Sequence, residues 1–262
     1  MKMNTKINTK TNTKILAFAG KGGVGKTSLA AVSVKLLVAA HPGKKILAID
    51  ADPAVGLSTA LGIEVETTID DIRKEVVSTV EEGNTKTAIE LLGEAEYKIT
   101  DAIVESEGFA FIAIGRPETA GCYCKINSYL KAVIQMIAEN FDYVVIDGEA
   151  GIEQINRRVM EKVTHLMLVT DSSKKGTDVI QTIKRVADEL VMYEEAGAVV
   201  NRMPDLAMKD LVHTGDIPVL SYIGTDSELA SYDLTGKNVF YLPDDAEVVT
   251  KMQEALHVMK LL

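Results

Sequence analysis

The stretch Gly20-Lys21-Gly22-Gly23-Val24-Gly25-Lys26-Thr27 decides the fold of this chain. It matches the pattern G-x-x-x-x-G-K-[ST] of a phosphate-binding loop, and it lies between an apolar run and a segment of helical period. The glycines let backbone N–H groups turn inward around phosphate oxygens, and the N-terminus of the following helix adds positive potential. In such a loop Lys26 can reach the β- and γ-phosphates, while the Thr27 hydroxyl can bind Mg²⁺. The alternative is a glycine-rich turn without a ligand.

Short apolar runs rich in β-branched residues alternate with segments of helical period along the whole chain. Because these runs are apolar throughout, they predict strands buried on both faces, as in a parallel sheet with crossover helices. The expected strands are 14–19, 45–49, 109–114, 143–146, 165–169, 198–200 and 219–223, and the expected helices are 26–40, 69–80, 127–139, 154–162, 177–193 and 246–261. The prediction is an α/β fold, a single domain over residues 14–262 with a doubly wound, mostly parallel sheet.

Two segments stand apart from this alternation. Met1–Thr13 is rich in Asn, Thr and Lys and lacks the apolar residues needed to order it, so we expect a flexible leader at 1–13. Glu81–Glu107 is polar and helical in propensity, and we expect it to form an excursion between the second and third strands.

Composition narrows the partners and the compartment. The 262 residues carry 28 Lys and Arg against 38 Asp and Glu, a formal net charge of −10. This acidity argues against nucleic acid and against an anionic membrane surface as partners, because both attract an excess of cations. No apolar run is long enough to predict a membrane span. Two cysteines are too few for a disulfide framework, so we expect a cytoplasmic protein.

A second lysine, Lys21, directly follows the first glycine of the loop. An ordinary phosphate-binding loop does not need it, because Lys26 already serves the chain's own nucleotide. With this lysine the loop resembles the deviant Walker A class of ATPases, which includes nitrogenase iron protein, MinD, ParA and the ATPases that target tail-anchored proteins. The resemblance implies that Lys21 reaches across a dimer interface to the partner's nucleotide. A solvated lysine on the loop is the alternative.

Two further stretches place acids at strand ends, where ligands of open α/β sheets bind. Residues 46–53 read ILAIDADP, and residues 143–151 read YVVIDGEAG. The resemblance implies that Asp52 orients or activates the attacking water and that Asp147 is the Walker B aspartate. Asp50 is expected as a magnesium-side or structural acid. An ordinary helix cap is the alternative for either strand-end aspartate taken alone.

Three more positions resemble nucleotide contacts of the same class. Gly151 resembles the switch glycine whose N–H senses the γ-phosphate. Asn201, at the end of the sixth strand, resembles the asparagine that hydrogen-bonds adenine, whose edge requires both a donor and an acceptor. Residues 242–245, which include Pro243, resemble the later loop that packs on the base. An asparagine after a strand is also a common turn residue. The expected nucleotide-binding residues are Gly20, Lys21, Gly22, Gly23, Val24, Gly25, Lys26, Thr27, Ser28, Gly151, Asn201, Arg202 and Pro243; the expected catalytic residues are Lys21, Lys26, Asp52 and Asp147; the expected Mg²⁺ ligands are Thr27, Asp50 and Asp147.

Residues 115–124 read GRPETAGCYC and follow the third expected strand, so they also leave the ligand-bearing edge. In extended backbone, residues i and i+2 point the same way, so the thiolates of Cys122 and Cys124 can bind one soft metal ion. Two ligands are too few for a closed tetrahedral site, but a two-fold dimer would supply four. The alternative is a pair of buried, inert cysteines.

The pattern GRPE-x-x-GCYC resembles the CooC-type ATPases, which mature nickel enzymes of carbon monoxide metabolism, and the resemblance runs from Lys14 onward. It implies an ATPase that forms a homodimer with ATP and Mg²⁺, holds Ni²⁺ or Zn²⁺ at the shared Cys-x-Cys site, and serves a client nickel apoenzyme. That client is carbon monoxide dehydrogenase or acetyl-CoA synthase. The alternative function is a ParA/MinD-like positioning switch that uses the same ATP-driven dimerisation without a metal.

Overall fold

The centre of the molecule is an eight-stranded sheet in the order β3-β4-β2-β5-β1-β6-β7-β8. The computed structural model describes residues 13–54, 56–83, 85–116, 124–148, 153–190 and 193–262. Seven strands run parallel, whereas β3 runs antiparallel to β4. The strands are β1 (Lys14–Gly20), β2 (Ile46–Asp50), β3 (Val104–Ser106), β4 (Phe109–Ala113), β5 (Tyr143–Asp147), β6 (His165–Thr170), β7 (Glu195–Met203) and β8 (Val219–Gly224).

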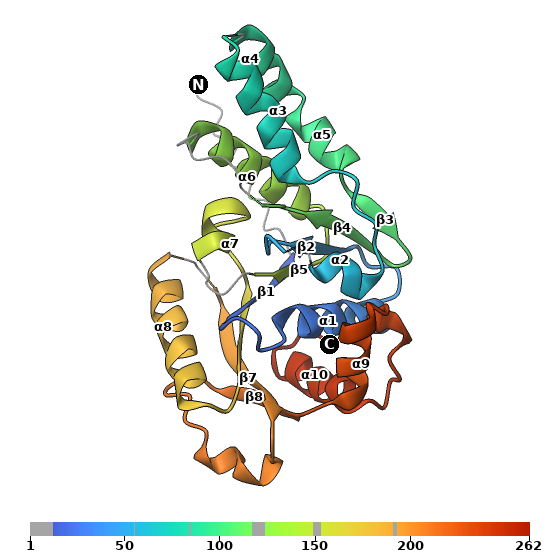
Figure 1. Cartoon of the computed structure of the whole chain (residues 1–262), viewed down its shortest axis with the longest axis vertical. Helices are drawn as coiled ribbons and strands as arrows, with labels where there is room; N and C mark the ends of the chain where they lie inside the picture. The colour runs from blue at the N-terminus through green and yellow to red at the C-terminus, as the bar shows by residue number, and fades with distance from the viewer. Residues whose placement is uncertain (1–12, 55, 84, 117–123, 149–152, 191–192) are drawn as a thin grey trace, which may run out of the picture.

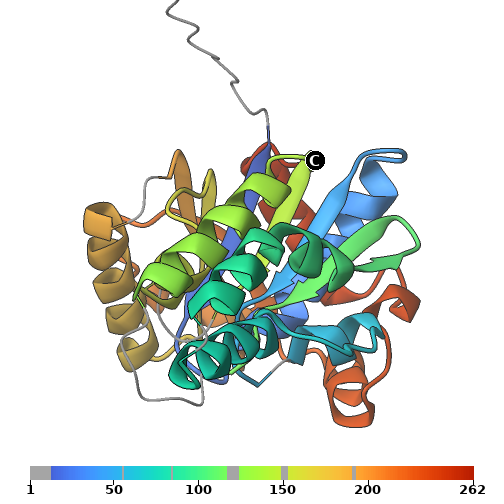
Figure 2. The same cartoon turned by 90° about the horizontal axis from the view of Figure 1, so that it is seen from above.

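Helices cover both faces of this sheet (Figure 1). One face carries α1 (Lys26–Ala40), α2 (Gly56–Leu61), α9 (Ser227–Thr235), the short 3-10 helix η2 (Val239–Tyr241) and α10 (Glu247–Val258). The opposite side carries α3 (Ile69–Glu81), α4 (Thr85–Gly93), α5 (Ala95–Asp101), α6 (Cys124–Ala138), α7 (Glu153–Arg158) and α8 (Lys174–Leu190). A second 3-10 helix, η1 (Leu206–Leu211), follows β7. Figure 2 shows the green and teal helices α3 to α6 lying across their face of the sheet.

Strand β1 shows why the strand segments are apolar throughout. Leu16 and Phe18 belong to the core beneath α1 and α10, whereas Ala17 and Ala19 belong to the core on the opposite face. All four side chains are fully buried. Successive side chains of a strand point to opposite faces, so a strand covered on both sides must be apolar at every position. The predicted doubly wound, mostly parallel sheet in a single domain is confirmed.

The seven predicted strands are all present, and the structure adds elements that the hydrophobic pattern did not predict. Strand β3 has only three residues, and Glu105 and Ser106 in it are exposed. Helices α2 and α9 are also short, and a short element carries too little of its hydrophobic period to be recognised. The excursion predicted at 81–107 contains α4, α5 and β3.

Residues 1–12 of the expected leader lie outside the described residues, whereas Thr13 is buried, and its hydroxyl donates to the Glu139 carbonyl at 3.4 Å. None of the helices in the described segments has the length and hydropathy to cross a membrane.

The carboxyl ends of neighbouring strands bring the acids and the phosphate-binding loop to one edge. Asp147 pairs in register with Asp50 of β2 and with Phe18 of β1, two residues before the loop begins. Strand β4 ends beside them, because the backbone N–H of Ile114 donates to the Asp50 carbonyl at 2.8 Å. The segment that contains the two cysteines therefore begins at this same edge.

Candidate functional site

Two glycines give the phosphate-binding loop its shape. Gly20 has φ +154°, and a Cβ there would lie 2.0 Å from the Val169 carbonyl oxygen of β6, so no side chain fits. Gly25 caps α1 with φ +94°, in the left-handed region that favours glycine. A cavity of about 410 Å³ opens over the loop. Its lining consists of Gly22, Gly23, Gly25, Lys26, Thr27, Asp52 and Arg202, all of which were expected to serve nucleotide binding or catalysis.

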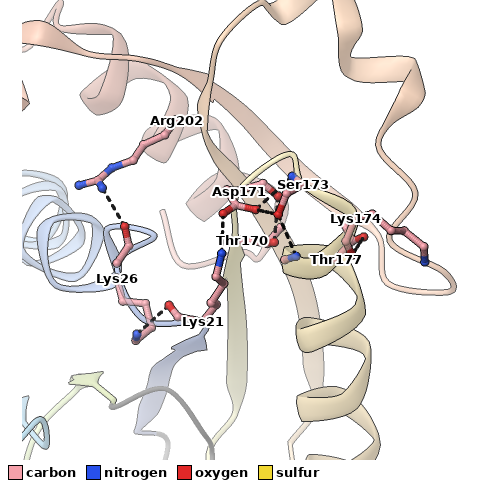
Figure 3. Close-up of polar contacts among 10 residues, drawn as sticks. Lys21, Lys26, Thr170, Asp171, Ser173, Lys174, Thr177 and Arg202 are labelled. Carbon is pink, nitrogen blue, oxygen red and sulfur yellow. Dashed lines mark hydrogen bonds and ion pairs between the residues drawn. The ribbon is translucent and has the colours of Figure 1, made fainter.

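The two lysines of the loop have different surroundings. Lys26 is buried, and its ammonium donates to the Lys21 carbonyl at 3.3 Å. Lys21 is about one-third exposed, and its Nζ lies 3.1 Å from Oδ2 of Asp171 (Figure 3). Asp171 directly follows β6. In the single chain Lys21 therefore pairs within its own chain, and the expected contact across an interface requires that pair to open.

Asp171 is itself held in place by its neighbours. Its Oδ1 accepts hydrogen bonds from the backbone N–H of Ser173 at 3.0 Å and from the Ser173 hydroxyl, and that hydroxyl oxygen accepts the Gly176 N–H at 3.0 Å. Partial burial acts to raise the pKa of Asp171, but Ser173 and Lys21 outweigh it and hold the pKa below its ordinary value. The carboxylate is thus charged and aimed at Lys21, as Figure 3 shows.

The Asp147 carboxylate has no hydrogen-bond partner among the described residues. It is fully buried at the end of β5, and neither oxygen accepts a hydrogen bond. Burial raises the pKa of Asp147 to about 7, while the nearby Thr27 hydroxyl and Lys26 ammonium act to lower it. A buried carboxylate without partners is costly unless a cation compensates it. Magnesium ions are usually bound by one or two carboxylates together with phosphate and water oxygens, so Asp147 and Thr27 fit such a site.

Asp50, the third expected magnesium ligand, already has backbone partners. Its Oδ1 accepts the Asp52 N–H at 3.1 Å, and its Oδ2 accepts the Leu57 N–H of α2 at 2.9 Å. Burial raises its pKa to about 6 against these bonds. Asp50 therefore anchors the turn between β2 and α2. Of its two expected roles, magnesium ligand or structural acid, this favours the structural one. Asp52 lies in that turn, half-buried, and lines the cavity over the phosphate-binding loop.

Asn201 and Arg202, expected at the base, hold the phosphate-binding loop in this structure. Asn201 is buried, and its Nδ2 donates to the Val24 carbonyl at 2.8 Å. Arg202 donates to the Gly23 carbonyl at 2.7 Å, from a backbone with φ +57° that non-glycine residues rarely adopt. Strain of this kind persists only where surrounding contacts enforce it, and it is concentrated at functional sites.

A second cavity, of about 510 Å³, adjoins the first and shares Gly25 and Arg202 with it. It is lined by Ser28 and Asn201 and by the segment that follows β8, including Asp226 and Asp233. The Ser28 hydroxyl lies 3.0 Å from both Asp233 oxygens. This cavity lies beside the phosphate-binding loop and is lined in part by Asn201, the residue expected to contact adenine.

Pro243 is not among the residues that line either of these two cavities, and its expected contact with the base stays a prediction. It is exposed, and the neighbouring Leu242 carbonyl accepts from Lys35, nine residues along α1 from Lys26. The segment that lines the second cavity begins at Gly224. The sequence contains a signal for this segment, because Asp226, a typical N-cap residue, follows an apolar strand and caps helix α9.

Two expected site residues, Gly151 and Cys122, lie outside the described residues. Cys124 is the first residue of α6, so the extended backbone expected for it is wrong: the helix begins three residues earlier than the predicted 127–139. Within the described segments no group of three or more His, Cys, Asp or Glu side chains is arranged to hold a metal ion.

The buried Asp147 carboxylate makes stability depend on pH. Its pKa is raised from 3.8 to about 7, so the protonated form stabilises the fold at low pH, and this contribution is lost as the pH rises through about 7. In metal-free buffer with a chelator, we expect Asp147→Asn to be more stable than wild type at pH 8 by about 1–4 kcal/mol and to lose most of that advantage at pH 5. Urea denaturation at both values measures it.

Asp142→Asn is the matched control, because Lys44 holds the pKa of Asp142 below its ordinary value. The control should be no more stable than wild type at pH 8. A metal-free Asp147→Asn protein that is less stable than wild type at pH 8 would contradict this account of the carboxylate.

Comparisons with known proteins agree with this geometry. Residues 13–193 match a family model described as an AAA domain. The chain is 36% identical over 244 residues to an uncharacterised ATP-binding protein of Methanocaldococcus jannaschii, across 92% of this chain and 96% of that protein. It is 26% identical over 250 residues to the carbon monoxide dehydrogenase accessory protein CooC of Rhodospirillum rubrum, across 84% of this chain and 90% of that protein. The solved cell division ATPase MinD of Pyrococcus furiosus superposes with a TM-score of 0.67 at 21% identity, across 95% and 99% of the two chains. The chain therefore belongs to the AAA domain family, and its sheet has the fold of the MinD and ParA P-loop proteins.

Proposed function

We propose that this protein is a cytoplasmic, ATP-hydrolysing maturation factor that dimerises with ATP and hands a metal ion to a nickel apoenzyme. The client is carbon monoxide dehydrogenase or acetyl-CoA synthase. The observation that carries the proposal is that three features begin or end at one sheet edge: a phosphate-binding loop, the buried Asp147 carboxylate, and the segment that bears the only two cysteines of the sequence.

The described residues supply the parts that ATP hydrolysis requires. Lys26 and the backbone of the loop bind the phosphates, and Asp52, which lines the same cavity, positions the attacking water. Asp147 and Thr27 would hold Mg²⁺, which neutralises charge on the phosphates when it is bound. Most of the catalysis of phosphoryl transfer comes from positioning and electrostatics, so no covalent chemistry of the protein is needed.

The metal-handling part of the proposal rests on residues 115–124, called here the cysteine segment, and on one relative. The segment leaves β4 next to Asp50, close to the acids of the nucleotide site. The similarity to CooC, a protein named for carbon monoxide dehydrogenase, extends over most of the chain. Two thiolates from each of two chains complete the four ligands of a tetrahedral site, and the cargo ion, Ni²⁺ or Zn²⁺, is a substrate of the pair.

A metal-free positioning switch of the ParA or MinD kind is the second candidate function. It is favoured by the likeness of the whole sheet to solved ParA and MinD proteins. Both candidates use ATP to bring two chains together, so the ATP site alone does not separate them. The cysteines do.

The pair between Lys21 and Asp171 yields a test of ATP-driven dimerisation. Each dimer must open two such pairs, and partly exposed pairs are each worth about 0.2–1 kcal/mol. Asp171→Asn should therefore strengthen the dimer formed with a non-hydrolysable ATP analogue by roughly twofold to thirtyfold, whereas Lys21→Ala should bind the analogue but stay monomeric. Sedimentation velocity over a range of protein concentrations measures both effects.

The control for this test is Lys174→Ala, because Lys174 is an exposed lysine that pairs with Asp178 on α8 and not with the loop. It should dimerise like wild type. If Lys21→Ala also dimerises like wild type, Lys21 has no role across the interface, and the proposed dimer mechanism is wrong.

The cysteines test the metal-handling function. Titration of Zn²⁺ or Ni²⁺ into the full chain should show one ion per two chains, with an affinity that rises with pH because each thiol must lose its proton to bind. Cys122→Ser and Cys124→Ser should each abolish this binding and leave nucleotide affinity unchanged. The control Ser128→Ala should keep both metal binding and nucleotide affinity at the wild-type level. Isothermal titration calorimetry measures all four proteins. Equal, sub-stoichiometric heats in wild type and Cys122→Ser would reject metal handling and favour the metal-free switch.

A further inference from the structure

A buried cluster of charged side chains lies beneath the point where the cysteine segment leaves the sheet. Asp70, in the first turn of α3, is almost fully buried, and its Oδ1 accepts from Nε of Arg73 at 2.7 Å. Arg158, the last residue of α7, brings a second guanidinium, whose Nη2 lies 3.9 Å from the same oxygen. Lys74 adds a third cation, 3.7 Å from Oδ2. This Asp70 cluster joins α3 to α7.

The Asp70 cluster also holds the first residues of the cysteine segment. The backbone N–H of Asp70 donates to the Ile114 carbonyl at 2.9 Å, and Nη2 of Arg158 donates to the Gly115 carbonyl at 2.9 Å. The Ile114 N–H in turn bonds the end of β2. The backbone of Ile114 and Gly115, at the start of the segment that leads to the cysteines, is therefore held by β2, by α3 and by α7.

Each of these three attachments begins at the nucleotide site. Strand β2 carries Asp50, the chain from β2 to α3 carries Asp52, and α7 is the first helix after Asp147. The Arg158 side chain is only 16% exposed, and it is the contact by which α7 holds Gly115. A shift of α7 relative to the sheet therefore acts on Gly115 through this hydrogen bond.

We propose that Arg158 is a positioning residue that couples the nucleotide state to the two cysteines, by linking the helix after Asp147 to the Gly115 carbonyl. The inference rests on the proposed function, because it assigns how the ATP site of a maturation factor controls its thiolates. It adds that the coupling runs through one guanidinium donor. Because coupling between two sites is reciprocal, occupancy of the thiolates acts on nucleotide affinity through the same contact.

The chain offers a direct readout, because Cys122 and Cys124 are its only cysteines. The rate at which a chromogenic thiol reagent labels metal-free, full-length protein is measured with no nucleotide and with Mg²⁺ and a non-hydrolysable ATP analogue. In wild type the two rates should differ by about fivefold or more. In Arg158→Met, which retains the length but loses the donors, the ratio should fall to near one while nucleotide affinity stays unchanged. Arg158→Lys, which keeps one donor, should restore much of it.

Arg157→Met is the matched control, because Arg157 precedes Arg158 on α7 and is exposed. It should keep the wild-type ratio. If Arg158 has only a structural role, Arg158→Met will change the labelling rate in both states and leave the ratio intact, and that result would overturn the inference. A wild-type labelling rate that is the same with and without nucleotide would also overturn it. The labelling needs no metal, so a protein that shows the coupling but binds no stoichiometric metal would reject the proposed function alone. A protein that binds one ion per two chains with an unchanged ratio in Arg158→Met would reject only the coupling.

Discussion

The site is organised around the carboxylate of Asp147, which is buried at the end of β5. Its oxygens make no close hydrogen bond within the described residues, although the Thr27 hydroxyl and the Lys26 ammonium lie near enough to lower its pKa. Isolated buried charge is among the most costly features a fold can contain, and proteins keep it where a ligand compensates it. Asp50 lies beside it in register, but its own oxygens are occupied by the backbone of the β2–α2 turn. Of the two carboxylates, Asp147 is therefore the one whose oxygens remain open to a cation, beside Thr27 and Lys26 of the phosphate-binding loop.

The parallel sheet explains why so many segments can respond to that cavity. Strands β1, β2, β4 and β5 all end at one edge of the sheet. The phosphate-binding loop, the β2–α2 turn with Asp52, and the cysteine segment therefore start side by side. On the other side of the loop, the end of β7 braces it through Asn201 and Arg202. Binding of nucleotide at this edge therefore acts on several connections at once, which is the property that both candidate functions require.

Features that are local in the sequence were predictable, and features that depend on distant partners were not. The strands, the phosphate-binding loop and the acids at the ends of β2 and β5 follow from apolar runs and motif spacing. Nothing local shows that Asp171 faces Lys21, 150 residues earlier, or that Arg158 reaches Gly115, because these pairings exist only after the sheet is assembled. The segment after β8 was missed for the same reason, since nothing local in the sequence shows that it lines the cavity beside Asn201. The antiparallel β3 was missed because three residues, two of them polar, carry no period.

The central claim is that nucleotide and thiolate-bound metal act on one dimer, and a linkage measurement tests it most directly. Zinc affinity of the full chain is measured by competition with a chromophoric chelator, once without nucleotide and once with Mg²⁺ and a saturating non-hydrolysable ATP analogue. The account predicts that the analogue tightens zinc binding by about fivefold or more, and that zinc tightens analogue binding by the same factor. Equal zinc affinities in the two conditions would contradict it.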